Sequence, residues 1–128
     1  MRGVTLAETI LASCLLGLVM LALFNLLPGG LFAIRQGEQR IYADSLAAAW
    51  LEDLRQAPYE NLNSGVYLPD PADQTVNGVT YQTRIEIYQI AGHELDRIKR
   101  IRVVVGWRFG SRDRQISQET YRANVRRP

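Results

Sequence analysis

Glu8 is the residue near the N-terminus whose chemistry most clearly requires a partner. It is the only charged residue between Gly3 and Ile34, and 26 uncharged residues follow it without interruption. A carboxylate in a membrane-length apolar segment costs up to roughly 3 kcal/mol unless another group neutralises it. We therefore expect Glu8 to meet a cationic group and to serve a function.

The residues around Glu8 resemble the processing site of type IV prepilins and pseudopilins. The segment reads Gly3-Val4-Thr5-Leu6-Ala7-Glu8, and an apolar stretch follows it directly. The resemblance implies that a membrane aspartic protease, the prepilin peptidase, cuts between Gly3 and Val4, and that Val4 is then N-methylated. It also implies that Glu8 pairs with the terminal amine of a neighbouring subunit during filament assembly. The family usually has Phe where this chain has Val4, and the leader here is very short.

The apolar run divides the chain into a leader (1–3), a transmembrane and assembly helix (4–34) and a soluble domain (35–128). The run is long enough to cross a hydrocarbon core about 30 Å thick. It exceeds the apolar region of a secretory signal, which has about 7–15 residues. We expect a single pass of the bacterial inner membrane, with the soluble domain periplasmic or extracellular. A plain anchor unrelated to filaments would explain the apolar run but not Glu8.

Apolar spacing predicts that the helix continues into the soluble domain. Between Gln39 and Leu54, one face collects apolar side chains at helical spacing. They are Ala43, Leu46, Ala47, Trp50, Leu51 and Leu54. Trp50 is expected to anchor the core, and Pro58 to end the helix. Pro28-Gly29-Gly30 is expected to kink the helix or to melt it locally.

The rest of the chain predicts an antiparallel sheet. Residues 61–75 are polar and rich in turn formers, so we expect a loop there, and Asn77-Gly78 favours a two-residue hairpin turn. Residues 81–87 and 101–109 alternate between apolar and polar side chains, and 116–125 is β-prone. Turns at 91–94 and 110–113 would join these strands into a meander. The expected fold is α+β, a long N-terminal helix packed on a small antiparallel sheet, which is also the pilin architecture.

The net charge of +2 conceals two long segments of opposite net charge. Residues 38–96 carry ten acidic and three basic side chains, whereas residues 97–128 carry ten basic and two acidic ones. Five arginines form a candidate interaction face: Arg97, Arg100, Arg102, Arg112 and Arg114. Such a face would dock on an acidic surface of the next subunit or, as in competence pili, on DNA phosphates. The alternative is that these charges have no external partner, because they pair within the fold or are solvated.

The sequence shows no catalytic constellation. Its single histidine is His93 and its single cysteine is Cys14, which lies in the apolar run. Asp70 and Asp73 are weak evidence for a calcium site, since no further ligand spacing accompanies them. We therefore expect no enzyme activity, cofactor or metal. The expected partners are the prepilin peptidase, the inner membrane and other pilin or pseudopilin subunits, with DNA as the less favoured one. The expected function is that of a structural subunit, and a minor one, because residues 47–62 and Val103-Val104-Val105-Gly106-Trp107 resemble minor pilins and minor pseudopilins. The sequence leaves open whether a type IV pilus, type II secretion or competence system uses the chain, and whether the subunit lies at the tip or in the shaft.

Overall fold

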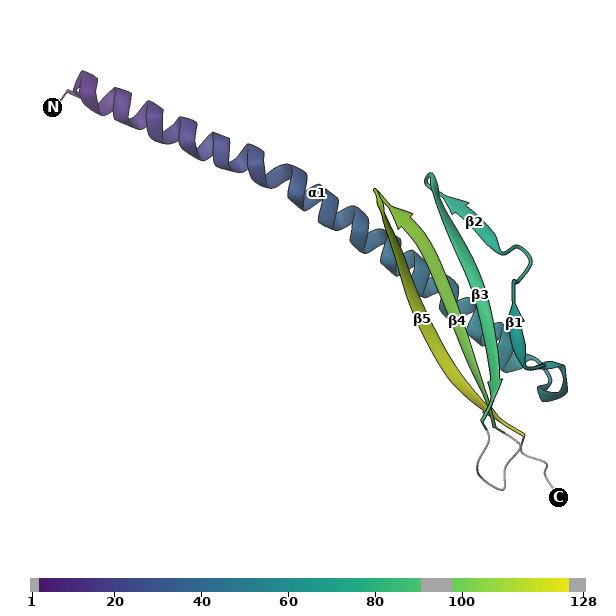
Figure 1. Ribbon diagram of the computed structural model, residues 1–128. Coiled ribbons are helices and arrows are strands. Elements are labelled where there is room, and N and C mark those ends of the chain that lie inside the picture. Colours follow the sequence, from purple (N-terminus) through teal and green to yellow (C-terminus); the bar gives the residue numbers. More distant parts are fainter. Residues whose placement is uncertain (1–2, 91–97, 125–128) are drawn as a thin grey trace. The chain divides into compact units, whose positions relative to one another are not determined.

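The computed structural model describes residues 3–90 and 98–124 of the chain. Its elements are helix α1 (Leu6–Gln56), a 3-10 turn η1 (Tyr59–Asn61) and strands β1 (Gly65–Tyr67), β2 (Asp73–Val76), β3 (Val79–Gln89), β4 (Ile98–Phe109) and β5 (Arg112–Ala123) (Figure 1). The chain divides into two compact units, residues 1–38 and residues 39–128. The second unit contains the C-terminal part of α1 and the whole sheet. The α+β layout expected from the sequence is confirmed.

Helix α1 runs unbroken through Pro28, Gly29 and Gly30, so the expected local melting is wrong. Proline removes one backbone hydrogen bond and costs about 3 kcal/mol relative to alanine. The helix has 51 residues, and leucines flank the interruption on both sides. Because the other hydrogen bonds remain, one proline does not end a helix of this length. Helix α1 ends at Gln56, shortly before Pro58, as expected, and η1 begins directly after this proline.

In the second unit, α1 packs on one face of the sheet, here called the inner face. Ala43, Ala47 and Leu51 are spaced four residues apart and are buried against it. The two alanines are completely buried, which brings the helix backbone close to the strands. The predicted apolar face is thus confirmed. The prediction that Trp50 anchors the core is wrong, because Trp50 is only partly buried and lies beside this row.

The sheet has the order β1-β3-β4-β5, with β2 also paired to β3, and all its pairings are antiparallel. Successive residues of a strand point to opposite faces. The buried inner-face side chains of β3 and β4 are Tyr81, Thr83, Ile85, Ile87, Ile101, Val103, Val105 and Trp107. The core of the unit therefore lies between this row and α1.

Two hairpin turns agree with the sequence, and one predicted loop does not. Asn77 and Gly78 have φ of 51° and 77° and join β2 to β3, as a type I′ turn requires. Gly110 has φ of 61° in the turn between β4 and β5. The predicted loop 61–75 contains β1 and part of β2, because both pair with β3 although three or four residues are too few to show a strand pattern. The expected turn at 91–94 lies outside the described residues.

Candidate functional site

The N-terminal segment lies outside the helix and is exposed. Residues 3–5 precede the helix, and Val4 is 73% exposed. A Cβ added at Gly3 would meet no atom within 4 Å, so packing within this chain does not require glycine there. The peptide bond between Gly3 and Val4 is therefore open to an enzyme that approaches the backbone closely. A small residue at position 3 suits such an approach.

Thr5 caps the helix, a role that the sequence interpretation missed. The backbone N–H of Glu8 donates to Thr5 Oγ1 at 3.3 Å and to the Thr5 carbonyl at 3.0 Å. Thr5 and Glu8 stand three residues apart, which is the spacing of a capping box. This signal was readable in the sequence. Only the Thr5 half of the box is formed, through the backbone N–H of Glu8, so the Glu8 side chain takes no part in the cap.

The Glu8 carboxylate has no ion pair or hydrogen bond within the described residues. An acidic residue in the first turn gains about 0.3–1 kcal/mol from the helix dipole. This gain is smaller than the cost of up to roughly 3 kcal/mol for a carboxylate in hydrocarbon. Helix capping alone therefore does not offset the charge, and Glu8 is available to a cation from another molecule.

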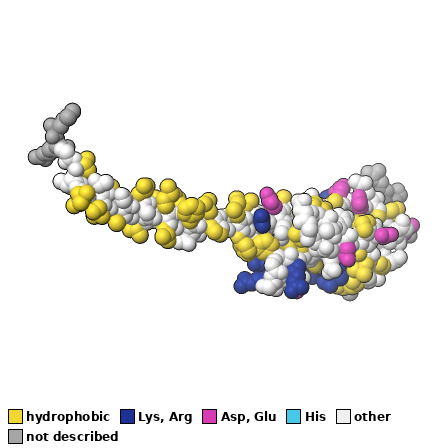
Figure 2. Space-filling view, turned by 90° about the horizontal axis from the view of Figure 1, so that it is seen from above, with side chains coloured by type: hydrophobic (Ala, Val, Ile, Leu, Met, Phe, Trp, Pro, Cys, Tyr) yellow, Lys and Arg dark blue, Asp and Glu magenta, His cyan; other side chains and the backbone are white. Residues whose placement is uncertain are grey.

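The N-terminal part of α1 is apolar on every side and is not covered by the chain itself. By length and composition α1 can cross a membrane, and its most apolar window has no buried residue. Leucines around the helix, such as Leu16, Leu21 and Leu27, are 59–64% exposed. Figure 2 shows hydrophobic side chains along this segment. A helix that is hydrophobic all round is covered by lipid or protein, so α1 suits a single-pass membrane anchor.

The described arginines of the candidate basic face do not share one face of the sheet. Arg100 and Arg102 lie opposite Tyr88 and Glu86 on the outer face, which α1 does not cover. Arg112 and Arg114 of β5 lie opposite Phe109 and Trp107, on the inner side. The alternation of side chains along each strand separates the two pairs. Arg97 lies outside the described residues.

Acidic side chains within the chain already partner the outer-face arginines. Glu86 is only 8% exposed, and its carboxylate lies 3.0 Å from Arg84 Nε and 3.9 Å from Arg102. Arg102 also lies 3.6 Å from Glu119, a distance that allows an ion pair but not a hydrogen bond. The Arg100 guanidinium lies 5.4 Å from the centre of the Tyr88 ring. These contacts weaken the outer face as a free basic surface.

Glu86→Ala is expected to destabilise the second unit by about 1–3 kcal/mol, because it leaves Arg84 and Arg102 without their nearly buried acceptor. Glu60→Ala is the matched control, since Glu60 is exposed and forms no ion pair in the described part of the chain. Thermal unfolding of the two variants gives the comparison. Equal melting temperatures would mean that the Glu86 contacts contribute nothing to stability.

The described residues contain no group of three or more His, Cys, Asp or Glu side chains that could hold a metal ion. Cys14 is exposed on α1, and His93 lies outside the described residues. A shallow hollow of about 540 Å³ lies beside Gly106, and its rim includes Gln82, Arg108 and Gln115. The rim also includes Thr80 and Asp113.

Comparison of the chain with protein families, curated proteins and solved structures found no match.

Proposed function

We propose that this chain is a structural subunit, and a minor one, of a type IV pilus or of a type II secretion pseudopilus. It would assemble through α1 after the prepilin peptidase removes residues 1–3. One observation carries the proposal: the Glu8 carboxylate has no partner among the described residues, at the start of a helix whose apolar surface the chain leaves uncovered. A plain anchor accounts for the apolar surface but supplies no partner for Glu8.

The proposed assembly step follows from charge and burial. Cleavage after Gly3 creates a terminal amine at Val4, and this amine on one subunit would neutralise Glu8 on its neighbour. A pair of opposite charges in an apolar environment is worth several times more than the same pair in water. The exposed apolar side chains of α1 would then pack against the helices of neighbouring subunits. The Glu8 carboxylate and the Val4 amine would then leave the lipid as an ion pair, so neither charge would be buried alone.

A DNA-binding role, as in a competence system, has less support. The two arginines on the outer face contact acidic or aromatic side chains of the same chain. The two arginines of β5 lie on the other side of the sheet. A duplex would need several free cations along one surface, since neutralised phosphates supply most of the affinity. The four described arginines of the candidate face are divided between the two faces of the sheet and do not form such a surface together.

The processing step is the direct test. In cells with an active prepilin peptidase, the mass of the membrane-extracted protein should show loss of residues 1–3 and one added methyl group at Val4. Gly3→Ala should reduce or block this change, because the added Cβ obstructs the approach of the protease to the backbone.

Gly37→Ala is the matched control. An added Cβ also meets no atom within 4 Å there, and the residue lies far from the cut, so processing should be normal. Cells without the peptidase should leave the wild-type chain whole. An intact Met1 in wild-type protein from cells with the active peptidase would contradict the proposal.

A further inference from the structure

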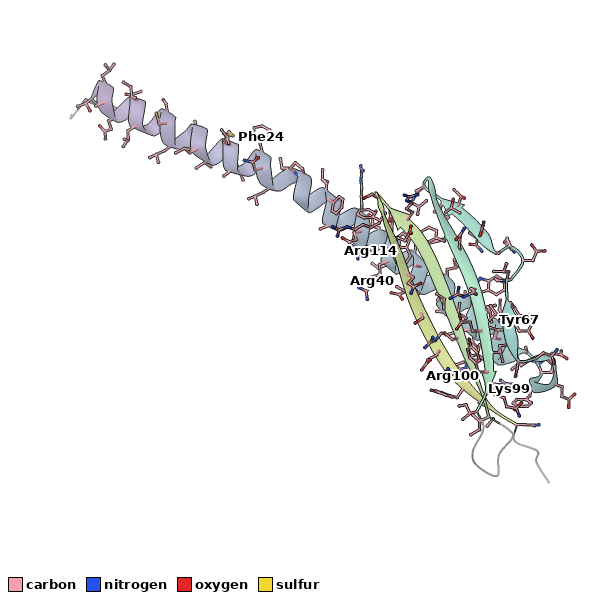
Figure 3. All side chains as sticks on the ribbon, viewed as in Figure 1. Phe24, Arg40, Tyr67, Lys99, Arg100 and Arg114 are labelled. Carbon is pink, nitrogen blue, oxygen red and sulfur yellow. The ribbon has the colours of Figure 1, made fainter. Side chains whose placement is uncertain are left out.

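Three arginines gather at the end of the second unit where the chain enters it. Arg40 is on α1, and Arg112 and Arg114 are at the start of β5. We name them the entry arginines. Figure 3 shows Arg40 and Arg114 at one end of the unit and Arg100 at the other.

Hydrogen bonds between β5 and α1 fix this placement. The Gln118 amide donates to the Asp44 carbonyl at 3.2 Å, and Arg122 donates to the carbonyls of Arg55 and Ala57. The strand and the helix therefore run in the same direction. Arg114 and Arg40 each stand four residues before the first of these contacts, so they lie at the same end.

The entry arginines have no counter-ion within the described residues. Arg40 and Arg112 are exposed, and the four ion pairs of the described chain include none of the three. Arg114 is half-buried, and its Nε is buried without a hydrogen-bond partner. This buried Nε is not open to an anion from outside, and Arg100 and Arg102 each have one too. The exposed guanidinium groups of Arg40 and Arg112 are the ones that such an anion can reach.

The nearby carboxylates form no ion pair with the entry arginines in the described chain. Asp113 lies opposite Arg108, on the outer face. Glu38 stands two residues before Arg40, which places it about 200° around a helix of 3.6 residues per turn. Asp44 stands one turn after Arg40 and accepts a hydrogen bond from Gln118 at 3.4 Å, so it offsets part of the charge. The three arginines therefore keep an excess of positive charge.

The bilayer surface is the nearest source of anions. Arg40 follows Ile34, the last residue of the uncharged run, by six residues. Six helical residues span about 9 Å at 1.5 Å each. The headgroup layer extends about 5–8 Å beyond the hydrocarbon on each side. With Ile34 at the edge of the hydrocarbon, an arginine side chain from this position would reach the phosphates.

We propose that the entry arginines bind the phosphodiester headgroups of anionic phospholipids and dock the second unit on the membrane surface. Guanidinium groups bind phosphate oxygens in a bidentate manner, and clustered arginines next to a membrane span are attracted to anionic lipid. This inference rests on the membrane anchor and goes beyond the proposed assembly role. It requires neither cleavage at Gly3 nor a filament.

A nitroxide on the turn between β4 and β5 can report docking. Ser111 is exposed and directly precedes Arg112, and Cys14 is the only cysteine. The full chain with Cys14→Ser and Ser111→Cys would be labelled and reconstituted in vesicles that carry a nickel-chelating lipid. Nickel relaxes the label only at short range, so the relaxation measures the docked fraction in phosphatidylcholine vesicles with and without phosphatidylglycerol.

We expect the ratio of docked to undocked protein to rise with phosphatidylglycerol by about fivefold per arginine, or roughly 100-fold for three. Raising the salt from about 0.1 M to about 1 M shortens the Debye length from about 10 Å to about 3 Å and should reverse most of the rise. This salt titration uses the unsubstituted arginines, so it tests the proposal even if a variant misfolds.

Arg112→Gln/Arg114→Gln should remove most of the response to phosphatidylglycerol. Arg55→Gln/Arg100→Gln is the matched control, because it removes the same charge from the other end of the unit, where the Arg55 pair with Glu52 is exposed, and should keep the response. Equal relaxation with and without phosphatidylglycerol, or a response that survives loss of Arg112 and Arg114, would overturn the proposal. A response to free inorganic phosphate alone would also overturn it, because the ligand would then be a soluble anion. A response that follows protein density in place of lipid charge would overturn it as well, because it would indicate a neighbouring acidic subunit.

Discussion

Glu8→Ala should leave membrane insertion intact and strongly reduce incorporation of the subunit into filaments or tip complexes. The substitution removes the charge that opposes insertion, so insertion should not suffer. Inside an assembly, it leaves the Val4 amine of a neighbour unmatched. Two charges about 4 Å apart at an effective dielectric of about 20 contribute about 4 kcal/mol. Loss of even half of this energy lowers association by more than about tenfold.

Thr5→Ala separates this role of Glu8 from its place in the helix cap. That variant keeps the carboxylate but removes the Oγ1 that accepts the Glu8 N–H. Loss of a cap costs about 1 kcal/mol of helix stability, so assembly should be nearly normal. The measurement is the ratio of subunit in sheared filaments or isolated tip complexes to subunit in membranes. Normal incorporation of Glu8→Ala, or an equal defect in Thr5→Ala, would contradict pairing between subunits.

Local signals explain why much of the fold could be predicted from the sequence. The row Ala43, Ala47 and Leu51 repeats every four residues, and this repeat alone places one side of the helix on a core. Asn77-Gly78 requires positive φ at both residues, and few turns other than a type I′ hairpin use such a pair. Neither signal depends on contacts far along the chain.

Features that depend on distant pairing were not predictable in the same way. Trp50 and Trp107 both lie in apolar patterns, and only the packing of α1 on β4 decides which of them is buried. Strands β1 and β2 have only three and four residues, and they exist because β3 offers an edge on which to pair. The alternation of β4 and β5 in register divides the arginines between two faces, whereas net charge gives only their sum.

The residues of the candidate site also divide into those readable from local sequence and those that only the fold brings together. Gly3, Val4 and Glu8 are adjacent in sequence, so their spacing was readable directly, and so was the capping role of Thr5. The entry arginines come from α1 and β5, more than 70 residues apart. Sequence alone grouped Arg112 and Arg114 with Arg100 and Arg102. The structure instead places them at the end of the unit where Arg40 lies.

Trp107→Ala should lower the free energy of unfolding of the second unit by about 3–5 kcal/mol, the usual cost of truncating a large buried aromatic side chain. Trp107 is 7% exposed, and its ring lies 6.1 Å from that of Tyr81. The Tyr81 ring in turn lies 4.7 Å from that of Tyr42 on α1. Removal of the indole therefore opens a cavity at the point where β3, β4 and α1 meet.

Trp50→Ala should cost less, about 1–3 kcal/mol, because burial of part of a side chain contributes only part of its transfer free energy. Denaturant unfolding of a fragment from Gln36 onward, followed by circular dichroism, compares the two variants without the membrane segment. Trp107→Phe is the conservative control and should retain more stability than Trp107→Ala, since it keeps a ring beside Tyr81. If Trp50→Ala proved the more damaging change, the core would be centred on the helix side, contrary to the packing described above. A larger loss of unfolding free energy for Trp107→Ala than for Trp50→Ala would support the packing of α1 against β4 at Trp107.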